Sequence, residues 1–200
     1  MAKAEWLNTS PAAGSGNGTV TVKSNGEHTG RKVRTTTLTW KAANVQNIER
    51  TVNQAGKPEN VSIDENASAD KNGKVVTISG VSNSAKLTFS LGSGDLDITL
   101  PTSYTVNGMA VDNGAAISGD PGASAEYNFS IAINVPANTA TASKTRQIIV
   151  RDEAGKDDIC LLTSAAGDAY VTIPEGAIEL DWQGTPVTIE VKSNTAWTVS

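Results

Sequence analysis

The chain has 200 residues, of which 16 are basic, 21 are acidic and 38% are hydrophobic, so its net charge is −5. No stripe of Lys and Arg stands out, which argues against a nucleic-acid partner. No apolar run approaches the ~18 residues that a membrane-spanning segment needs, and residues 1–6 contain no apolar signal-peptide core. We therefore expect neither a membrane partner nor secretion through a signal-peptide pathway.

Short runs of alternating apolar and polar residues recur along the chain and are typical of β-strands. In chain order these runs are GTVTVKS (18–24), TTTLTW (35–40), KLTFSL (86–91), YNFSIAINV (127–135), RQIIV (146–150) and TPVTIEVKS (185–193). Turn signals such as KNGK (71–74), VNGM (106–109) and GDPG (119–122) lie between them. No window keeps apolar residues at helical spacing. The pattern predicts an all-β fold of Ig-like antiparallel β-sandwiches.

Internal similarity indicates that one structural unit ends and another begins twice, near residues 57 and 168. NIERTVNQAGK (47–57) resembles DICLLTSAAGD (158–168), and Val61-x-Ile63 matches Val171-x-Ile173. AKLTFSLGSGDLDITL (85–100) also aligns without gaps to TPVTIEVKSNTAWTVS (185–200). On this alignment, the turn-rich stretch 69–80 is an insertion.

These matches predict one complete sandwich and one sandwich that is split, in permuted order, between the two ends of the chain. Residues 57–167 form the complete unit. Residues 1–56 are the C-terminal two-thirds of a second unit, and residues 168–200 are the opening strands of such a unit. The two end segments together have a suitable length for one sandwich.

Three motifs in the end segments resemble the BACON domain family. They are SNTAWTVS (193–200), EWLNTSPAAGSGNGTVTVKSN (5–25) and Gln54-Ala55-Gly56, which closes a strand. BACON domains are Ig-like β-sandwiches abundant in Bacteroidetes proteins, and the resemblance implies carbohydrate association, often in secreted glycosidases. Bacteroides-infecting phages of the crAss-like group also carry BACON domains. Since no signal peptide is found, the resemblance implies a virion protein assembled in the host cytoplasm.

A sandwich that lacks its opening strands leaves an open core and unpaired backbone groups, which are costly. We expect residues 171–200 of one subunit to complete residues 5–56 of the next, by strand donation from head to tail. The expected donor residues are Val171, Ile173, Ile178, Leu180, Val187, Ile189, Val191 and Trp197. The expected acceptor residues are Val20, Val22, Leu38, Ile48 and Val52.

Other ways of completing the split unit remain open at this point. The native chain continues past Ser200 in one alternative, and a different virion protein supplies the missing strands in another. Closure within one chain is disfavoured, because a ten-residue strand covers roughly 33 Å and the junctions at 57–60 and 168–170 are too short to lead back.

The function expected from these features is structural: a capsid auxiliary (decoration) or head-fibre component. Its partners would be copies of itself and other virion proteins such as the major capsid protein. The alternative is a carbohydrate-binding module that attaches a particle or an enzyme to gut glycans. Trp40 and Trp182 are the candidates for contact with a glycan or with protein.

The sequence offers little for catalysis, so we expect no enzyme, no catalytic residue, no cofactor and no metal. His28 is the only histidine and is expected in an exposed loop, whereas Cys160 is the only cysteine and is expected in the core. Carboxylates in 62–70, 94–97 and 151–158 are typical of solvated turns. A calcium site within 62–73 is the best of the weak alternatives, since the region lacks a dedicated calcium-loop pattern.

Overall fold

The computed structural model describes residues 3–200 and consists of β-strands and one short 3₁₀ turn, which confirms the all-β prediction. The elements, in chain order, are β1 (Leu7–Ser10), β2 (Thr21–Ser24), β3 (Arg34–Ala42), β4 (Val45–Gln54), β5 (Val61–Ile63), β6 (Asn66–Ala69), β7 (Lys74–Ser82), β8 (Leu87–Gly94), β9 (Ser103–Val106), β10 (Met109–Asp112), η1 (Pro121–Ala123), β11 (Tyr127–Val135), β12 (Lys144–Asp152), β13 (Asp157–Ser164), β14 (Val171–Thr172) and β15 (Lys192–Ser193).

The middle of the chain, β5 to β13, forms a two-layer β-sandwich. One sheet has the order β10-β9-β11-β7-β5 and the other has the order β6-β13-β12-β8. The longest pairing is antiparallel, between β11 and β7, from Tyr127 opposite Ser82 to Val135 opposite Lys74. In β11 every second side chain is buried, because alternate residues of a strand point to opposite faces of its sheet.

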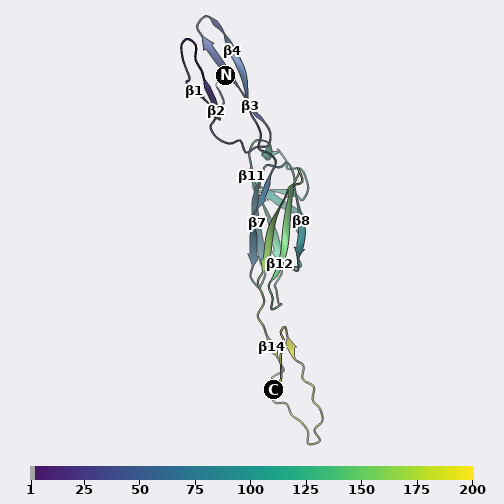
Figure 1. Cartoon of the computed structure of the whole chain (residues 1–200). Helices are drawn as coiled ribbons and strands as arrows, with labels where there is room; N and C mark the ends of the chain where they lie inside the picture. Colours follow the sequence, from purple (N-terminus) through teal and green to yellow (C-terminus); the bar gives the residue numbers. More distant parts are fainter. Residues whose placement is uncertain (1–2) are drawn as a thin grey trace.

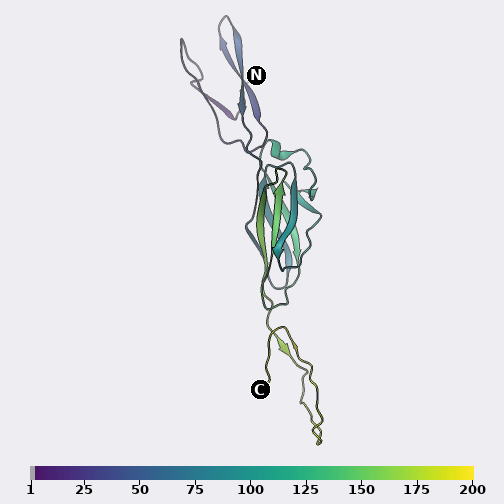
Figure 2. The same cartoon turned by 45° about the vertical axis from the view of Figure 1, so that its right-hand side comes forward.

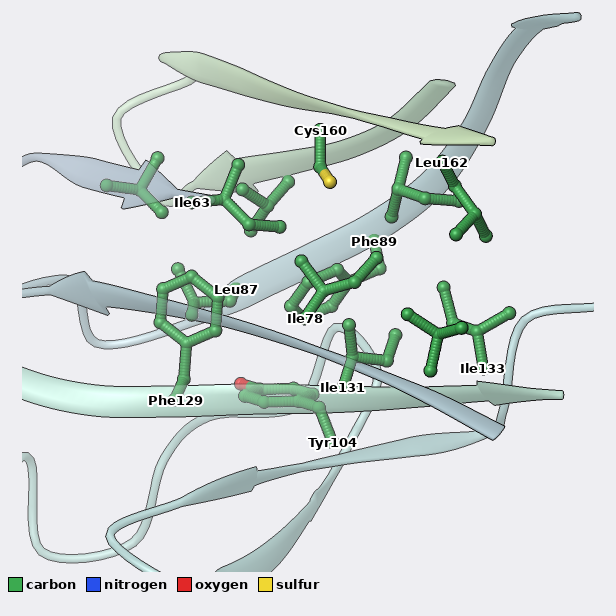
Figure 3. Packing of buried hydrophobic residues seen from close by; sticks show 14 of the residues in the cluster. Ile63, Ile78, Leu87, Phe89, Tyr104, Phe129, Ile131, Ile133, Cys160 and Leu162 are labelled. Atoms are coloured by element: carbon green, nitrogen blue, oxygen red, sulfur yellow. The ribbon is translucent and has the colours of Figure 1, made fainter. Parts of the chain in front are cut away.

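The core of this sandwich lies between the two sheets and is filled from both (Figure 3). Ile78 and Ile133 belong to the five-stranded sheet and are fully buried. Leu87 and Leu162 belong to the four-stranded sheet and are also fully buried. Cys160 is also fully buried and burial raises the pKa of its thiol to about 11, so the expected core position is confirmed. This part of the chain has a closed hydrophobic core of its own.

The two end segments lie at opposite ends of the sandwich (Figure 1). Residues 3–56 contain the β1–β2 pair and the β3–β4 hairpin at one end, and residues 168–200 contain the small β14–β15 pair at the other. A view turned by 45° shows the same separation (Figure 2). The segments therefore do not pair with each other within one molecule in this conformation.

Neither end segment has a core comparable to that of the sandwich. Leu7 and Leu38 are the buried large apolar side chains within residues 3–56, and no side chain within the range 168–200 is buried. Within residues 3–200, no helix is long and apolar enough to cross a membrane.

Candidate assembly surfaces at the two ends of the sandwich

The joint between the N-terminal segment and the sandwich is built around Asn83, which is fully buried. Its side-chain amide nitrogen donates to the carbonyl oxygens of Thr29 (3.2 Å), Lys57 (3.4 Å) and Pro58 (3.2 Å). Its side-chain oxygen accepts from the backbone N–H of Asn60 at 2.8 Å. One side chain thus satisfies backbone groups of both parts, as buried polar groups require. We call this arrangement the first joint.

Ion pairs surround the first joint. The Arg31 guanidinium donates to both carboxylate oxygens of Asp120, at 2.5 and 2.7 Å, and Lys57 pairs with Glu126 at 2.5 Å. The hydrogen bond from Arg31 is the main cause that holds the pKa of Asp120 below its ordinary value. Two-pronged pairs of this kind fix orientation as well as distance. The N-terminal segment is therefore held to the sandwich in a defined orientation.

The second joint, between the sandwich and the C-terminal segment, repeats the bonds of the first with Asn194 in the place of Asn83. The Asn194 side-chain nitrogen donates to the carbonyl oxygens of Thr139 (2.8 Å) and Asp168 (2.9 Å). Its side-chain oxygen accepts from the backbone N–H of Tyr170 at 3.0 Å. Thr139, Asp168 and Tyr170 are thus the counterparts of Thr29, Pro58 and Asn60.

The C-terminal segment reproduces the opening strands of the sandwich beyond this joint. Val171 is paired with Ser193, as Val61 is paired with Ser82. The Ser193 hydroxyl donates to the Tyr170 carbonyl at 2.9 Å, and the Ser82 hydroxyl donates to the Asn60 carbonyl at 2.7 Å. Residues 168–173 therefore match residues 58–63, and Ser193-Asn194 matches Ser82-Asn83.

A turn in each segment fixes the intervening alignment. The Asp70 side chain accepts from the Asn72 backbone N–H at 2.8 Å, and the Asp181 side chain accepts from the Gln183 backbone N–H at 3.0 Å. Each turn closes with a backbone bond from the following glycine at 3.1 Å. Residues 185–193 are thus the counterpart of β7. The gapless alignment of 185–200 with 85–100 was wrong, and the stretch 69–80 is no insertion, since residues 180–191 correspond to it.

The N-terminal segment reproduces the closing strands of the sandwich. In the β3–β4 hairpin Arg34 lies opposite Gln54, and in the β12–β13 hairpin Lys144 lies opposite Ser164. Before each hairpin a buried side chain contacts the carbonyl four residues later, His28 with Lys32 (2.7 Å) and Asn138 with Ala142 (2.9 Å). The N-terminal hairpin and the turn before it therefore match the β12–β13 hairpin and its preceding turn bond for bond.

The acceptor residues lie on the inner faces of the N-terminal segment. Val20, Val22 and Ile48 are 43, 39 and 50% exposed, whereas Leu38 is buried and Val52 is half-buried. Trp40, predicted as a glycan or protein contact, is 41% exposed. An open groove of about 580 Å³ runs between the two strand pairs and is lined by Val20, Leu38 and Trp40, among others.

The donor residues of the C-terminal segment are similarly uncovered. The exposed ones among them are Val171 (48%), Ile173 (57%), Ile178 (57%), Leu180 (63%), Val187 (51%) and Trp197 (49%). Ile189 and Val191 are half-buried. Because Val187 and Ile189 correspond to the buried Val76 and Ile78, this segment carries core-type residues without a core.

Two other predicted positions have different outcomes. His28 is only 8% exposed, so its assignment to an exposed loop was wrong; the ring is sealed into the first joint by its contact with the Lys32 carbonyl. Trp182 is 92% exposed at the tip of the Asp181 turn. Trp40 and Trp182 are not brought together, because they lie in segments at opposite ends of the sandwich (Figure 1).

The sequence analysis did not predict the two joints. A signal for them exists, because SNSA (82–85) and SNTA (193–196) share three of four letters and place the joint asparagine second. Within residues 3–200, no three His, Cys, Asp or Glu side chains gather into a metal-binding group. No protein-family model matches this chain, and no curated protein matches it.

Proposed function

We propose that this chain is a structural protein that assembles head to tail by exchanging strands between subunits. One observation carries the proposal. The exposed C-terminal segment has the same strand pairing as β5 and β7, near the start of the sandwich, and the exposed N-terminal segment has the same hairpin pairing as β12 and β13, at its end. In the sandwich these two sets of strands pair with each other, through β7 with β11 and β6 with β13.

The positions of the two segments support exchange between subunits. They extend from opposite ends of the sandwich, and both joints are tied by short backbone bonds (Figures 1 and 2). The donor segment therefore meets the acceptor segment of another copy rather than its own. A contact between two different surfaces of the same protein is heterologous, so repetition produces a ring or an open chain.

Burial of the exposed apolar residues supplies the driving force. Covering six donor side chains at ~1.5–3 kcal/mol each yields on the order of 10 kcal/mol. Association and side-chain ordering offset part of this, and backbone hydrogen bonds along the new strand pairs add directionality. Such a contact is strong enough to connect neighbouring subunits of a particle.

The resemblance to BACON domains supports a virion setting for this assembly. In that setting the protein is a capsid auxiliary (decoration) or head-fibre component, made in the host cytoplasm. Its partners are further copies of itself and other virion proteins such as the major capsid protein. The closed sandwich 57–167 would then be displayed between the exchanged units.

Mass photometry of the purified full chain tests the assembly. We expect multimers for the wild type and monomers for Ile189→Asp, which places a charge where Ile78 is buried in the sandwich. The matched control is Thr188→Asp, because its counterpart Thr77 is exposed and faces away from the core. A wild-type monomer, or equal effects of both substitutions, contradicts the proposal.

A second function, glycan binding, is favoured by the exposure of Trp182. An indole that is 92% exposed on a polar turn offers a flat surface for stacking on a sugar ring. Binding on a glycan array that disappears in Trp182→Ala but persists in Trp40→Ala would support this function. No binding by the wild type would leave assembly as the single role.

A further inference from the structure

We infer that the strand exchange has one fixed register, copied from the sandwich, in which Val187 of one subunit lies opposite Val22 of the next. Ile189 then lies opposite Val20. The inference rests on the proposed function and adds to it the residue-level geometry of the interface. The sandwich contains both partners of each equivalent pairing within one chain, so it acts as a template for the contact between chains.

The donor side of the register follows from two anchors on either side of residues 185–193. The Asp181 turn matches the Asp70 turn, and Ser193 matches Ser82 through its bond to the backbone carbonyl near the joint. No residue is gained or lost between the anchors in either segment. Val187 and Ile189 therefore take the places of Val76 and Ile78.

The acceptor side follows from the first joint and from one contact of β2. His28 corresponds to Asn138. β2 ends at Ser24, four residues before His28, and β11 ends at Val135, three residues before Asn138, so matching the two strand ends makes Ser24 the counterpart of Val135. Ser24 faces inward, because its hydroxyl accepts from the Gln54 side chain at 3.2 Å. Val22 and Val20, which alternate with Ser24 on the same face, therefore take the places of Ile133 and Ile131.

The template pairing then gives the contact between subunits. In the antiparallel β11–β7 pair, Ile133 lies opposite Val76 and Ile131 lies opposite Ile78. Replacing each residue by its counterpart puts Val22 opposite Val187 and Val20 opposite Ile189. Val20 lines the groove, and the four counterparts Val76, Ile78, Ile131 and Ile133 are all buried in the core of the sandwich.

The other sheet predicts a second, independent strand pairing between subunits, which is parallel rather than antiparallel. β6 runs parallel to β13, with Ala67 beside Leu162. Ala67 corresponds to Ile178 through the Asp181 turn, and Leu162 corresponds to Val52 through the hairpin register. Ile178 of one subunit thus lies beside Val52 of the next. The donor segment inserts one antiparallel and one parallel strand into the acceptor.

The same template assigns a place to Trp182. It occupies the position of Lys71, whose ammonium group pairs with Asp168 at the second joint. The counterpart of Asp168 at the first joint is Pro58, so the template puts the Trp182 ring beside Pro58 of the next subunit. Assembly therefore covers the most exposed tryptophan of the chain, and a tryptophan against a proline ring suits the centre of a contact. In this arrangement Trp182 is open to a glycan only in an unassembled copy or at the free end of an open chain.

Disulfide trapping between two variants, each with one introduced cysteine, tests the register. Val22→Cys and Val187→Cys are co-expressed as full-length chains and oxidised, and we expect a covalent dimer on a non-reducing gel. Directly opposite residues reach disulfide geometry, whereas the diagonal pair of Val22→Cys with Ile189→Cys lies roughly 7–8 Å apart and should not crosslink. Cys160 stays in place, because it is fully buried and its thiol pKa is about 11.

The outcomes separate the register from the assembly itself. Multimers with an efficient Val22–Ile189 crosslink, and none for Val22–Val187, overturn the register but keep strand exchange. Crosslinking of Val22→Cys alone into a symmetric dimer overturns the head-to-tail direction. If the wild type shows no multimers by mass photometry, the proposed function itself fails and no crosslink is expected.

Discussion

Asn83 at the first joint is the position where one small change should have the largest effect on the closed sandwich. Asn83→Ala removes the acceptor for the Asn60 N–H and the donor shared by the carbonyls of Thr29, Lys57 and Pro58. Because the side chain is fully buried, water does not replace these bonds. At about 1 kcal/mol for each of the three shorter bonds, we expect a loss of about 3 kcal/mol in the free energy of unfolding.

The measurement is denaturant unfolding followed by circular dichroism, in an Ile189→Asp background that keeps the chain monomeric. In a separate thermal melt of the same variant, the midpoint temperature should fall on the order of 10 °C. Asn194→Ala is the matched control, since it deletes the same bonds in the uncovered C-terminal segment. That control should leave the sandwich transition unchanged in the monomer. A loss below about 0.5 kcal/mol in Asn83→Ala, or equal losses in both variants, would refute the role assigned to the joint.

Three further predictions concern the joint and the core. Gly30→Ala should lower the midpoint temperature, because its Cβ would meet the backbone just after η1, whereas Gly26→Ala meets nothing within 4 Å and should be neutral. Ile133→Ala should cost about 2–5 kcal/mol in denaturant unfolding, because it opens a cavity in the core. Asp120→Asn should destabilise the joint at neutral pH. Because the hydrogen bond from Arg31 lowers the pKa of Asp120 from its ordinary value, the wild-type advantage should disappear in melting experiments as the pH falls through that lowered pKa.

Each of these predictions has a contrary result. Equal melting of the two glycine variants would mean that the joint is loose. Ile133→Ala should be compared with Val75→Ala, whose side chain is 62% exposed, and similar losses would contradict the packing described for the core. A difference between wild type and Asp120→Asn that grows on acidification would have the wrong sign for a carboxylate with a lowered pKa.

The sequence predicted the strands because they depend on local patterns. Alternation in 127–135 and 146–150 marks β11 and β12. The alignment of 185–200 failed because β7 and β8 share the same period-two alternation. Judged by polarity alone, Val187 and Ile189 match Leu87 and Phe89 of β8 as well as they match Val76 and Ile78 of β7. The two alignments are distinguished only by the hydrogen bonds of the Asp70 and Asp181 turns and of the Ser82 and Ser193 hydroxyls.

The two joints could not be predicted from local sequence patterns, for a different physical reason. Asn83 is held by backbone carbonyls from residues distant in the chain, and backbone atoms are the same in every residue type. His28 was misplaced because a polar loop sequence does not reveal that its ring bonds a carbonyl inside a tight turn. The pairing of Arg31 with Asp120 likewise joins residues that only the folded chain brings together.

The central claim is that each end segment is completed by the other end of a second copy. The most direct measurement is the mass of an equimolar mixture of two full-length variants. Ile189→Asp disables the donor and keeps the acceptor, and Val22→Asp disables the acceptor and keeps the donor. Each variant alone should be monomeric, and the mixture should stop at one-to-one dimers. Multimers in either variant alone, or a mixture that stays monomeric while the wild type assembles, would contradict the claim.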